Sequence, residues 1–484
     1  MAHPDDKQTP SLLEDASRGG DINEGGISFQ AAIVMGHIPR WMAMEGFTSM
    51  VREAIFDAEA KFFTPDHGFV KEAIEVKDHS VTPSEFWKEI NRFQQVDAGS
   101  PGSYAWFTLA SSGLSEGLHP LRNSLRRLRG PYGFYLDDPT ILGNSYRDYV
   151  RTVEKLGRTE TDADFLFRRV LIQDDLSLNR ANGKAVFKQE LNDHLPYHQD
   201  LSDRILEDIY THLGTFVQSR RNQGITRREL DEKLRERVPE ERQQPPQPVR
   251  LFTAKDDTVP ENRVIHFAWV PFFGGDARDI PYPAPEVWNE RLVGDLRATK
   301  AWILEHRNVR RIRVDGARRL SPAVAIGFVF SAVAGFAIDL VYRGDVWPTD
   351  AYETPETAAY PLDIRGSFDQ VPGNRLIVTV GILRNIVADV EADLPHLGLA
   401  DLPALHIQGA QGIQAPQQLD HIIREIKSHI SRALRASGAR QIELFLAGPA
   451  ALAVALGHRL NATANIQCYE QTKSGTYVPT CYLE

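Results

Sequence analysis

Residues 55–77 read IFDAEAKFFTPDHGFVKEAIEVK and carry the strongest chemical signal in the chain. Apolar and charged residues alternate in both halves of this stretch, a period of two that is typical of half-buried strands. The segment between the halves, residues 64–68, contains a proline and a glycine, which favour a turn. The pattern therefore predicts a hairpin that gathers Asp57, Glu75 and Lys77 on one face.

The residue types on that face allow two interpretations. Asp57 and Glu75 repel each other unless a divalent cation lies between them, and carboxylate oxygens suit Mg²⁺. Lys77 follows Glu75 by two residues, so it points the same way from a strand and can hold a phosphate oxygen or orient a water. A phosphodiesterase site fits this set. A solvated edge hairpin fits it as well, because Lys and Glu are common on sheet edges.

Length and composition indicate a globular protein of several domains. A chain of 484 residues exceeds the size at which one core stops growing, so two or three domains are expected. The net charge of −10 gives no overall attraction to nucleic acid, so DNA contacts must come from local basic patches. One candidate patch comprises Arg122, Arg126, Arg127 and Arg129, although a solvated helix face explains it equally.

The chain is expected in the cytoplasm and away from membranes. Two cysteines, Cys468 and Cys481, allow no disulfide framework and no cysteine zinc site, which fits a reducing cytosol. The polar, acidic N-terminus shows no secretory signal. Residues 320–342 are apolar over a length that suggests a membrane span, yet Pro322 favours a helix start and Gly335 a break. A buried helix followed by a buried strand is the preferred interpretation.

Changes of pattern along the chain predict its domain organisation. Mixed helix and strand patterns give way to helical spacing, then to a Pro/Gln stretch, then to alternating strands and helices that suggest paired Rossmann-like layers. No Gly-x-Gly-x-x-Gly follows a predicted strand, which argues against a dinucleotide redox cofactor. The predicted divisions are a core at 1–143, a helical part at 144–242, a linker at 243–250, and a domain at 251–484 with halves at about 251–350 and 370–484.

Ligands of such layered sheets bind at the carboxyl ends of the strands. Arg318, Arg319 and Ser321 follow one predicted strand and offer two guanidinium groups and a helix N-terminus to an anion. Arg384 follows another strand, and Gly448-Pro449 permits close approach of the backbone. A phosphate-bearing small ligand is favoured.

Aromatic side chains near these strand ends are candidates for stacking on bases. They are Phe272, Phe273 and Trp302. Each also fits the apolar core, because Phe272 ends a predicted buried strand and Trp302 lies on an apolar helix stripe.

Several runs of residues resemble a known family. RRLSPAVAIGFVFSAVAG at 318–335 and IELFLAGPAALAVALGHRLN…IQCYEQTKSGTYVP at 442–479 resemble the SAVED domain, the nucleotide-messenger sensor of bacterial CBASS anti-phage systems, which is built from two fused CARF-like units. GGISFQ at 25–30, with Asp57 and the Glu75-Val76-Lys77 run, is similar to the PD-(D/E)xK restriction-type nucleases fused to SAVED in CD-NTase-associated effectors.

This resemblance implies an α/β multidomain fold and a mechanism. A restriction-endonuclease-like core with a helical subdomain would precede a SAVED domain of two CARF-like, Rossmann-like units. The sensor of this family binds a cyclic oligonucleotide, often a cyclic trinucleotide, made by a partner CD-NTase nucleotidyltransferase. It then self-associates, and the nuclease cuts double-stranded DNA with little sequence preference, using Mg²⁺ or Mn²⁺. A sensor or adaptor without nuclease activity and a ribonuclease effector remain alternatives.

Carried onto this chain, the resemblance assigns roles to single residues. Asp57 and Glu75 are expected to be metal ligands and Lys77 the catalytic lysine. Gln30 stands where this superfamily often has Glu, and as a candidate catalytic residue it is expected to bond a water or a ligand carboxylate. Gln94, on the next helix, is a further candidate. A rival assignment uses the acid-x-Lys pair of Glu59 and Lys61, which is expected to be surface instead.

Overall fold

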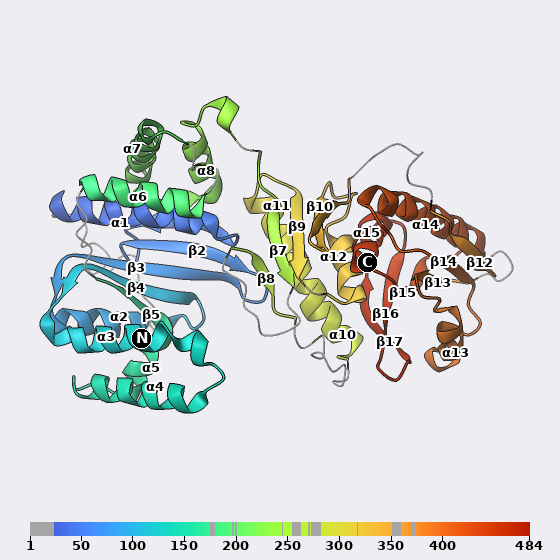
Figure 1. Cartoon of the computed structure of the whole chain (residues 1–484), viewed down its shortest axis with the longest axis horizontal. Coiled ribbons are helices and arrows are strands. Elements are labelled where there is room, and N and C mark those ends of the chain that lie inside the picture. The colour runs from blue at the N-terminus through green and yellow to red at the C-terminus, as the bar shows by residue number, and fades with distance from the viewer. Residues whose placement is uncertain are drawn as a thin grey trace, which may run out of the picture. The chain divides into compact units, whose positions relative to one another are not determined.

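The computed structural model describes residues 24–174, 180–195, 198, 201–243, 245–253, 263–269, 272, 282–316, 318–350, 360–368 and 373–484 (Figure 1). Contacts divide the chain into two compact units. Unit 1 contains residues 1–63 and 69–244, and unit 2 contains residues 64–68 and 245–484. The boundary at Gln244 falls within the predicted Pro/Gln linker, while the assignment of the two units as nuclease and sensor stays a prediction.

Unit 1 is built on a six-stranded sheet with the order β5-β4-β3-β2-β1-β6. β3, β4 and β5 are parallel, and β1 runs antiparallel to β2 and β6. The predicted hairpin is confirmed, because β2 and β3 are neighbours joined by a turn at 65–67. The strands are β1 (Phe47–Arg52), β2 (Ala58–Thr64), β3 (Gly68–Val81), β4 (Tyr104–Leu114), β5 (Val170–Gln173) and β6 (Ile225–Thr226).

Helices cover both faces of this sheet (Figure 1). One apolar core joins α1, α6, α7 and α8 to the face that carries Ile74 and Val76. The other joins α2, α3, α4 and α5 to the face that carries Ala73. The period of two in β3 therefore reflects burial on both sides, with Glu75 and Lys77 on the α2 side. The helices are α1 (Glu24–Ala43), α2 (Pro83–Gly99), α3 (His119–Arg129), α4 (Pro139–Glu154), α5 (Glu160–Arg169), α6 (Arg180–His194), α7 (Asp203–Ser219) and α8 (Arg227–Arg235).

The start of α2 confirms the helix signal in the sequence. Thr82 is the N-cap, Pro83 occupies the first turn, and Thr82 and Glu85 form a capping box. Each of the two side chains accepts from a backbone amide of the other, which satisfies donors that a helix start leaves free. α2 is thereby fixed directly after β3, with its buried face against the sheet.

Three expectations for unit 1 are wrong in detail. Asp57 lies in a bend before β2 rather than in the strand. Glu59 is buried instead of exposed at the surface, because the Tyr104 hydroxyl donates to its carboxylate at 2.7 Å. The predicted helical part contains β5, in which Val170 and Leu171 pair with β4. Their apolar spacing matches a helix as well as a short buried strand, so the pattern alone did not separate the two.

Unit 2 contains two sheets with mostly parallel strands, as expected for paired Rossmann-like layers. Their orders are β11-β10-β9-β7-β8 and β12-β14-β13-β15-β16-β17. Only the outer strands β11, β12 and β17 pair antiparallel among the described residues. The strands are β7 (Val249–Thr253), β8 (Ile265–Phe267), β9 (Arg311–Gly316), β10 (Ala337–Tyr342), β11 (Asp345–Pro348), β12 (Asp363–Gly366), β13 (Arg375–Ile382), β14 (Ala404–Gly409), β15 (Gln441–Ala447), β16 (Asn465–Gln471) and β17 (Tyr477–Leu483).

Two boundaries in unit 2 differ from expectation. β7 begins at Val249, inside the predicted linker, and pairs in parallel with β8 and β9. The strand expected from about residue 264 to 273 is shorter, since β8 ends at Phe267. The apolar and polar residues that alternate at the start of β7 directly follow the Pro/Gln stretch, so the sequence pattern did not separate the strand from the linker.

Two helices of unit 2 pack closely against each other. α12 and α15 cross where Gly327 and Gly457 face each other's backbone; a Cβ at these positions would lie 2.0 Å from Val454 O and 2.1 Å from Val324 O. Only glycine allows this approach. The helices are α10 (Pro285–Val287), the π-helical η7 (Trp288–Val293), α11 (Gly294–His306), α12 (Leu320–Val329), α13 (Val387–Leu397), α14 (Pro416–Ser437) and α15 (Ala450–Leu460).

The apolar run at 320–342 is a helix and a strand, as predicted. α12 ends at Val329 and β10 begins at Ala337. Within the described part of the chain, no helix has both the length and the apolar character needed to cross a membrane.

Candidate functional site

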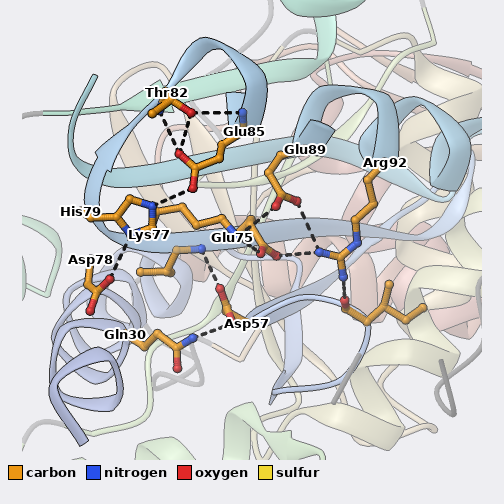
Figure 2. Close-up of polar contacts among 12 residues, drawn as sticks. Gln30, Asp57, Glu75, Lys77, Asp78, His79, Thr82, Glu85, Glu89 and Arg92 are labelled. Atoms are coloured by element: carbon orange, nitrogen blue, oxygen red, sulfur yellow. Dashed lines mark hydrogen bonds and ion pairs between the residues drawn. The ribbon is translucent and has the colours of Figure 1, made fainter. Parts of the chain in front are cut away.

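Four residues singled out from the sequence meet in unit 1 (Figure 2). Asp57, in the bend before β2, accepts a hydrogen bond from the backbone amide of Val76 at 2.7 Å through Oδ2. Its Oδ1 accepts from Gln30 Nε2, on α1, at 2.6 Å. Glu75 and Lys77 flank Val76 on β3, so the carboxylate of Asp57 is held beside both of them.

Lys77 lies between two carboxylates on the α2 side of the sheet. Its Nζ is 2.9 Å from Glu75 Oε1 and 2.9 Å from Glu89 Oε1. The first contact follows from the shared face of β3. Glu89 comes from α2 and was not singled out in the sequence. The available signal was its position on the buried side of α2, where a charged residue needs a partner.

Arg92 completes this network and was also missed. Its Nη1 is 3.1 Å from Glu75 Oε2 and 3.5 Å from Glu89 Oε2. Its Nη2 donates to the carbonyl oxygen of Ile55, and the guanidinium lies 4.9 Å from the ring centre of Phe56. Arg92 therefore contacts the strand that carries Glu75 and the bend that carries Asp57 (Figure 2).

Burial and neighbouring charges set the ionisation of this cluster. Burial, followed by the charge of Glu75, raises the pKa of Asp57 to about 8, against the Val76 amide, which lowers it. Burial disfavours the charge of Lys77, but Glu75 and Glu89 outweigh burial and raise its pKa above the usual range. The arrangement therefore favours a protonated Lys77, and it disfavours the charge of Asp57 beside Glu75.

The donor set fits a hard divalent cation. Asp57 and Glu75 offer carboxylate oxygens, which are chemically consistent with Mg²⁺ or Mn²⁺. Gln30 turns its amide nitrogen to Asp57, so it orients this carboxylate. A bound cation would also relieve the repulsion that raises the pKa of Asp57. No cluster of three or more His, Cys, Asp or Glu side chains suited to a metal occurs among the residues with described positions.

Two alternative candidates are not part of this cluster. Gln94 donates to Asp162 Oδ1 of α5 at 2.9 Å, which directs its side chain to another helix. The carboxylate of Glu59 accepts from Tyr104 and from the Ile55 amide, at 2.7 and 3.3 Å, and Lys61 is exposed on β2. The acid-x-Lys pair of β2 is therefore divided between interior and surface.

In unit 2, the start of α12 is fixed to the six-stranded sheet. The Ser321 amide donates to Glu470 Oε1 at 2.7 Å, and the Ser321 hydroxyl accepts from Thr480 at 2.8 Å. Glu470 stands near the carboxyl end of β16. Ser321 is 2% exposed, so its side chain joins the two layers rather than facing solvent.

The two arginines before α12 bond to neutral oxygens. Arg318 donates to the carbonyl oxygens of Asp315 and Val341, each at 3.3 Å, and burial lowers its pKa to about 10 although Asp315 partly offsets the effect. Arg319 donates to the hydroxyl of Tyr282 and lies over that ring, 4.9 Å from its centre. Two guanidinium groups are thus held next to the N-terminus of α12.

Other predicted ligand residues lie at the ends of β13 and β15. Arg384 is exposed and pairs with Asp389 at 2.9 Å. A Cβ on Gly448 would lie 3.3 Å from Ile382 Cβ, which places the two strand ends together, and Pro449 is the N-cap of α15. Backbone and a cation are therefore available at this edge.

The aromatic candidates are mostly core. Trp302 is 3% exposed and Phe272 is 1% exposed, so the structure favours the core interpretation over stacking on a base. Phe273 lies outside the described residues.

The C-terminal part of the chain matches a known sensor family. Residues 295–483 match the model described as "SMODS-associated and fused to various effectors sensor domain", or SAVED. The match covers both layers of unit 2 from α11 onward and includes Arg318, Arg384 and the α15 start.

The whole chain is similar to named proteins. It is 26% identical over 474 residues to CD-NTase-associated protein 4 of Moraxella osloensis, covering 98% of this chain and 99% of the relative. It is 26% identical over 480 residues to CD-NTase-associated protein 4 of Acinetobacter sp. (strain ATCC 27244 / 9458), with the same coverage of 98% and 99%.

Solved structures share the fold. One is the structure of the Acinetobacter baumannii Cap4 SAVED/CARF-domain containing receptor with the cyclic trinucleotide 3′3′3′-cAAA, which matches with a TM-score of 0.83 at 22% sequence identity. The match covers 96% of this chain and 100% of that receptor chain. The mixed α/β multidomain fold and the resemblance to CD-NTase-associated CBASS effectors with a SAVED sensor are confirmed.

Proposed function

We propose that this chain is a bacterial anti-phage effector whose SAVED domain binds a cyclic oligonucleotide, specifically a cyclic trinucleotide, and thereby activates a nuclease. Binding drives self-association, and unit 1 then cleaves double-stranded DNA with little sequence preference, using Mg²⁺ or Mn²⁺. The messenger comes from a partner CD-NTase nucleotidyltransferase. Free Cys468 and Cys481 fit a reducing compartment, so we place the activity in the cytoplasm.

One observation carries the nuclease part of this proposal. Gln30, Asp57, Glu75 and Lys77 come from three separate segments and form one hydrogen-bonded and ion-paired cluster. A solvated edge hairpin requires no such convergence, and β3 lies inside the sheet between β2 and β4. The cluster therefore favours a catalytic site over the alternative of an exposed edge.

The chemistry follows from the charge of each group. Asp57 and Glu75 would hold the divalent cation, which supplies Lewis-acid polarisation of a phosphoryl oxygen and of a water. Lys77 remains protonated because its pKa is raised, so it can donate to a phosphate oxygen but cannot act as a general base. Gln30 fixes the orientation of Asp57 through the 2.6 Å hydrogen bond.

Two arginines suited to DNA phosphates, Arg122 and Arg126, lie two strands away from Lys77 in the same sheet. Gln173 is opposite Ala110, which is opposite Val76, so the next residues along these strands are Asp174, Ser111 and Lys77. Because neighbouring strands are about 4.8 Å apart, the backbone of Asp174 lies roughly 10 Å from the backbone of Lys77. Its buried carboxylate binds Arg122 and Arg126 of α3, and the Arg126 side chain is 55% exposed.

The ligand part of the proposal rests on the strand ends of unit 2. Arg318 is a partly buried cation that bonds to carbonyl oxygens, and a phosphate would supply the negative charge that these partners lack. Arg384 adds a second cation, and the start of α15, whose N-cap is Pro449, presents the backbone amides of a helix N-terminus. The structurally similar Cap4 receptor holds a cyclic trinucleotide, which supports this ligand class.

The test is cleavage of plasmid DNA by the full chain with Mg²⁺ and a panel of cyclic di- and trinucleotides. We expect one cyclic trinucleotide to trigger cutting, and Lys77→Ala to abolish it. Lys61→Ala is the matched control, because Lys61 is exposed on the neighbouring strand. If no ligand triggers DNA cutting, the proposal is wrong; ligand binding without cutting would indicate an adaptor, and cutting of RNA alone a ribonuclease.

A further inference from the structure

Arg92 and Glu89 of α2 take part in the cluster but have no role in the reaction above. Glu89 is 7% exposed and the Arg92 side chain is 23% exposed. They are three residues apart, so both project toward β3 from one face of α2. Buried charged residues cost stability unless their partners compensate, so their contacts indicate what they do.

Arg92 connects the two segments that carry Asp57 and Glu75, and their alignment sets the geometry of the reaction. Its Nη1 contacts Glu75 of β3 at 3.1 Å, while its Nη2 donates to the carbonyl oxygen of Ile55. The guanidinium also covers the ring of Phe56, next to Asp57. Arg92 therefore adds a second link between β3 and this bend, beside the hydrogen bond from the Val76 amide to Asp57. Loss of Arg92 would loosen the orientation of Asp57 relative to Glu75.

The same guanidinium occupies an oxygen that a metal would use. Glu75 has Lys77 at Oε1, 2.9 Å away, and Arg92 at Oε2, 3.1 Å away. Two cations therefore share the carboxylate, and each repels a third cation placed at the same oxygens. A divalent cation can bind Glu75 only if Arg92 gives up part of its contact.

Glu89 contacts both Lys77 and Arg92 and can hold them when a divalent cation binds Glu75. Its Oε1 is 2.9 Å from Lys77 Nζ, and its Oε2 is 3.5 Å from Arg92 Nη1. The longer of these contacts can tighten when Arg92 leaves Glu75. Without the charge of Glu89, both cations would depend on Glu75 alone.

We propose that Arg92 is a positioning residue that aligns Asp57 with Glu75 and competes with the divalent cation for Glu75, and that Glu89 retains Arg92 and Lys77 when the cation binds. This inference rests on the proposed function, because it takes Asp57 and Glu75 as metal ligands. It predicts opposite effects for the two side chains. Removing Arg92 strengthens cation binding but slows cleavage, whereas neutralising Glu89 weakens cation binding.

The experiment measures Mn²⁺ binding to the full chain without DNA or cyclic nucleotide, from the electron paramagnetic resonance signal of free Mn²⁺. Arg92→Met should bind Mn²⁺ about tenfold more tightly and Glu89→Gln about tenfold more weakly, the effect of one partly buried charge pair. Arg158→Met is the control, because the Arg158 guanidinium lies over Trp87, 4.4 Å from its ring centre. It should leave Mn²⁺ affinity unchanged.

Cleavage at saturating Mn²⁺ separates positioning from competition. Arg92→Met should cut about tenfold more slowly, and Arg92→Lys should keep an Mn²⁺ affinity near that of the unsubstituted chain and recover part of the rate. If Arg92 were merely structural, its loss would weaken Mn²⁺ binding and slow cleavage. Weaker or unchanged Mn²⁺ binding by Arg92→Met therefore overturns the inference.

Failure of Arg92→Met to fold and absence of Mn²⁺ binding to the unsubstituted chain have different meanings. If Arg92→Met does not fold by far-UV circular dichroism, Glu89→Gln decides alone, and unchanged or tighter Mn²⁺ binding by that variant overturns the inference. If the unsubstituted chain binds no Mn²⁺, the proposed metal-dependent function fails, and the inference fails with it.

Discussion

The cluster around Lys77 and the edge around Arg318 each hold a partly buried cation, but the partners of the two cations differ. Lys77 contacts two carboxylates, and its pKa is raised. Arg318 contacts two carbonyl oxygens, and burial lowers its pKa to about 10. The carboxylates of the first site suit the divalent cation that we propose. The second is short of negative charge, which is what a phosphate supplies.

This difference shows how two sites in one chain can be assigned to different ligands. We propose a metal at the cluster with the carboxylates and an anion at the partly buried arginine that bonds to neutral groups. The assignment is chemical and does not depend on which cyclic nucleotide is bound. Substitutions should therefore affect one site without the other.

The largest expected effect is on ligand affinity after Arg318→Ala. Loss of a charge-assisted pair with phosphate should weaken binding of the activating cyclic trinucleotide about 100-fold, since such bonds contribute about 1.5 to 3 kcal/mol. Isothermal titration calorimetry measures this affinity, and Mn²⁺ binding should stay unchanged. Lys77→Ala should show the reverse pattern, with normal nucleotide affinity and no cleavage.

Arg365→Ala is the matched control for this experiment. Arg365 is exposed on β12 and pairs with Asp363 at 2.7 Å. It should bind the nucleotide as the unsubstituted chain does. Equal losses in Arg318→Ala and Arg365→Ala would contradict a specific phosphate site at the start of α12.

Much of the first site could be predicted from the sequence because its residues are close along the chain. The alternation in β3 placed Glu75 and Lys77 on one face, and the capping box at Thr82 located α2. Glu89 and Arg92 could not be predicted, because their contacts depend on how α2 is rotated against β3. The burial of Glu59 was missed for a similar reason, since its partner Tyr104 comes from a distant strand.

The second site was harder to predict because its residues meet only through topology. The strand and helix rhythm predicted the layers, and Arg318 was correctly placed after a strand. The link from Ser321 to Glu470 and Thr480 joins segments about 150 residues apart, which no local pattern reveals. The short strands β5 and β7 were missed because four or five residues carry little periodicity.

A smaller effect is expected from pH on the metal site alone. Burial and the charge of Glu75 raise the pKa of Asp57 to about 8, so Asp57 is largely protonated at pH 6 and must lose its proton to bind a cation. Apparent Mn²⁺ affinity should rise up to about tenfold per pH unit toward pH 8 and level off above it.

The same titration distinguishes the two sites. Nucleotide affinity should change little between pH 6 and pH 8, because the pKa of Arg318, about 10, lies above that interval. A flat Mn²⁺ profile over the same range would show that Asp57 is not the group that limits metal binding. Asp57→Asn should abolish the dependence together with tight Mn²⁺ binding.

The smallest expected effect is a gain of stability in Asp57→Asn. The folded chain holds the Asp57 proton more tightly than the unfolded chain does, because the pKa rises from 3.8 to about 8 on folding. Asp57 therefore lowers the free energy of unfolding progressively as pH increases from about 4 to 8. Asp57→Asn removes this penalty and should stabilise unit 1 at pH 8 by about 1 to 2 kcal/mol, with little change at pH 5.

Urea unfolding in the presence of EDTA, followed by circular dichroism, measures this difference at both pH values. Asp137→Asn is the control, because Asp137 is exposed and should change neither midpoint. A stabilisation of equal size at pH 5 and pH 8 would mean that shape, not charge, explains the gain. A gain confined to pH 8 would show that the cluster keeps a carboxylate at a cost to stability, as expected for a group that binds a cation.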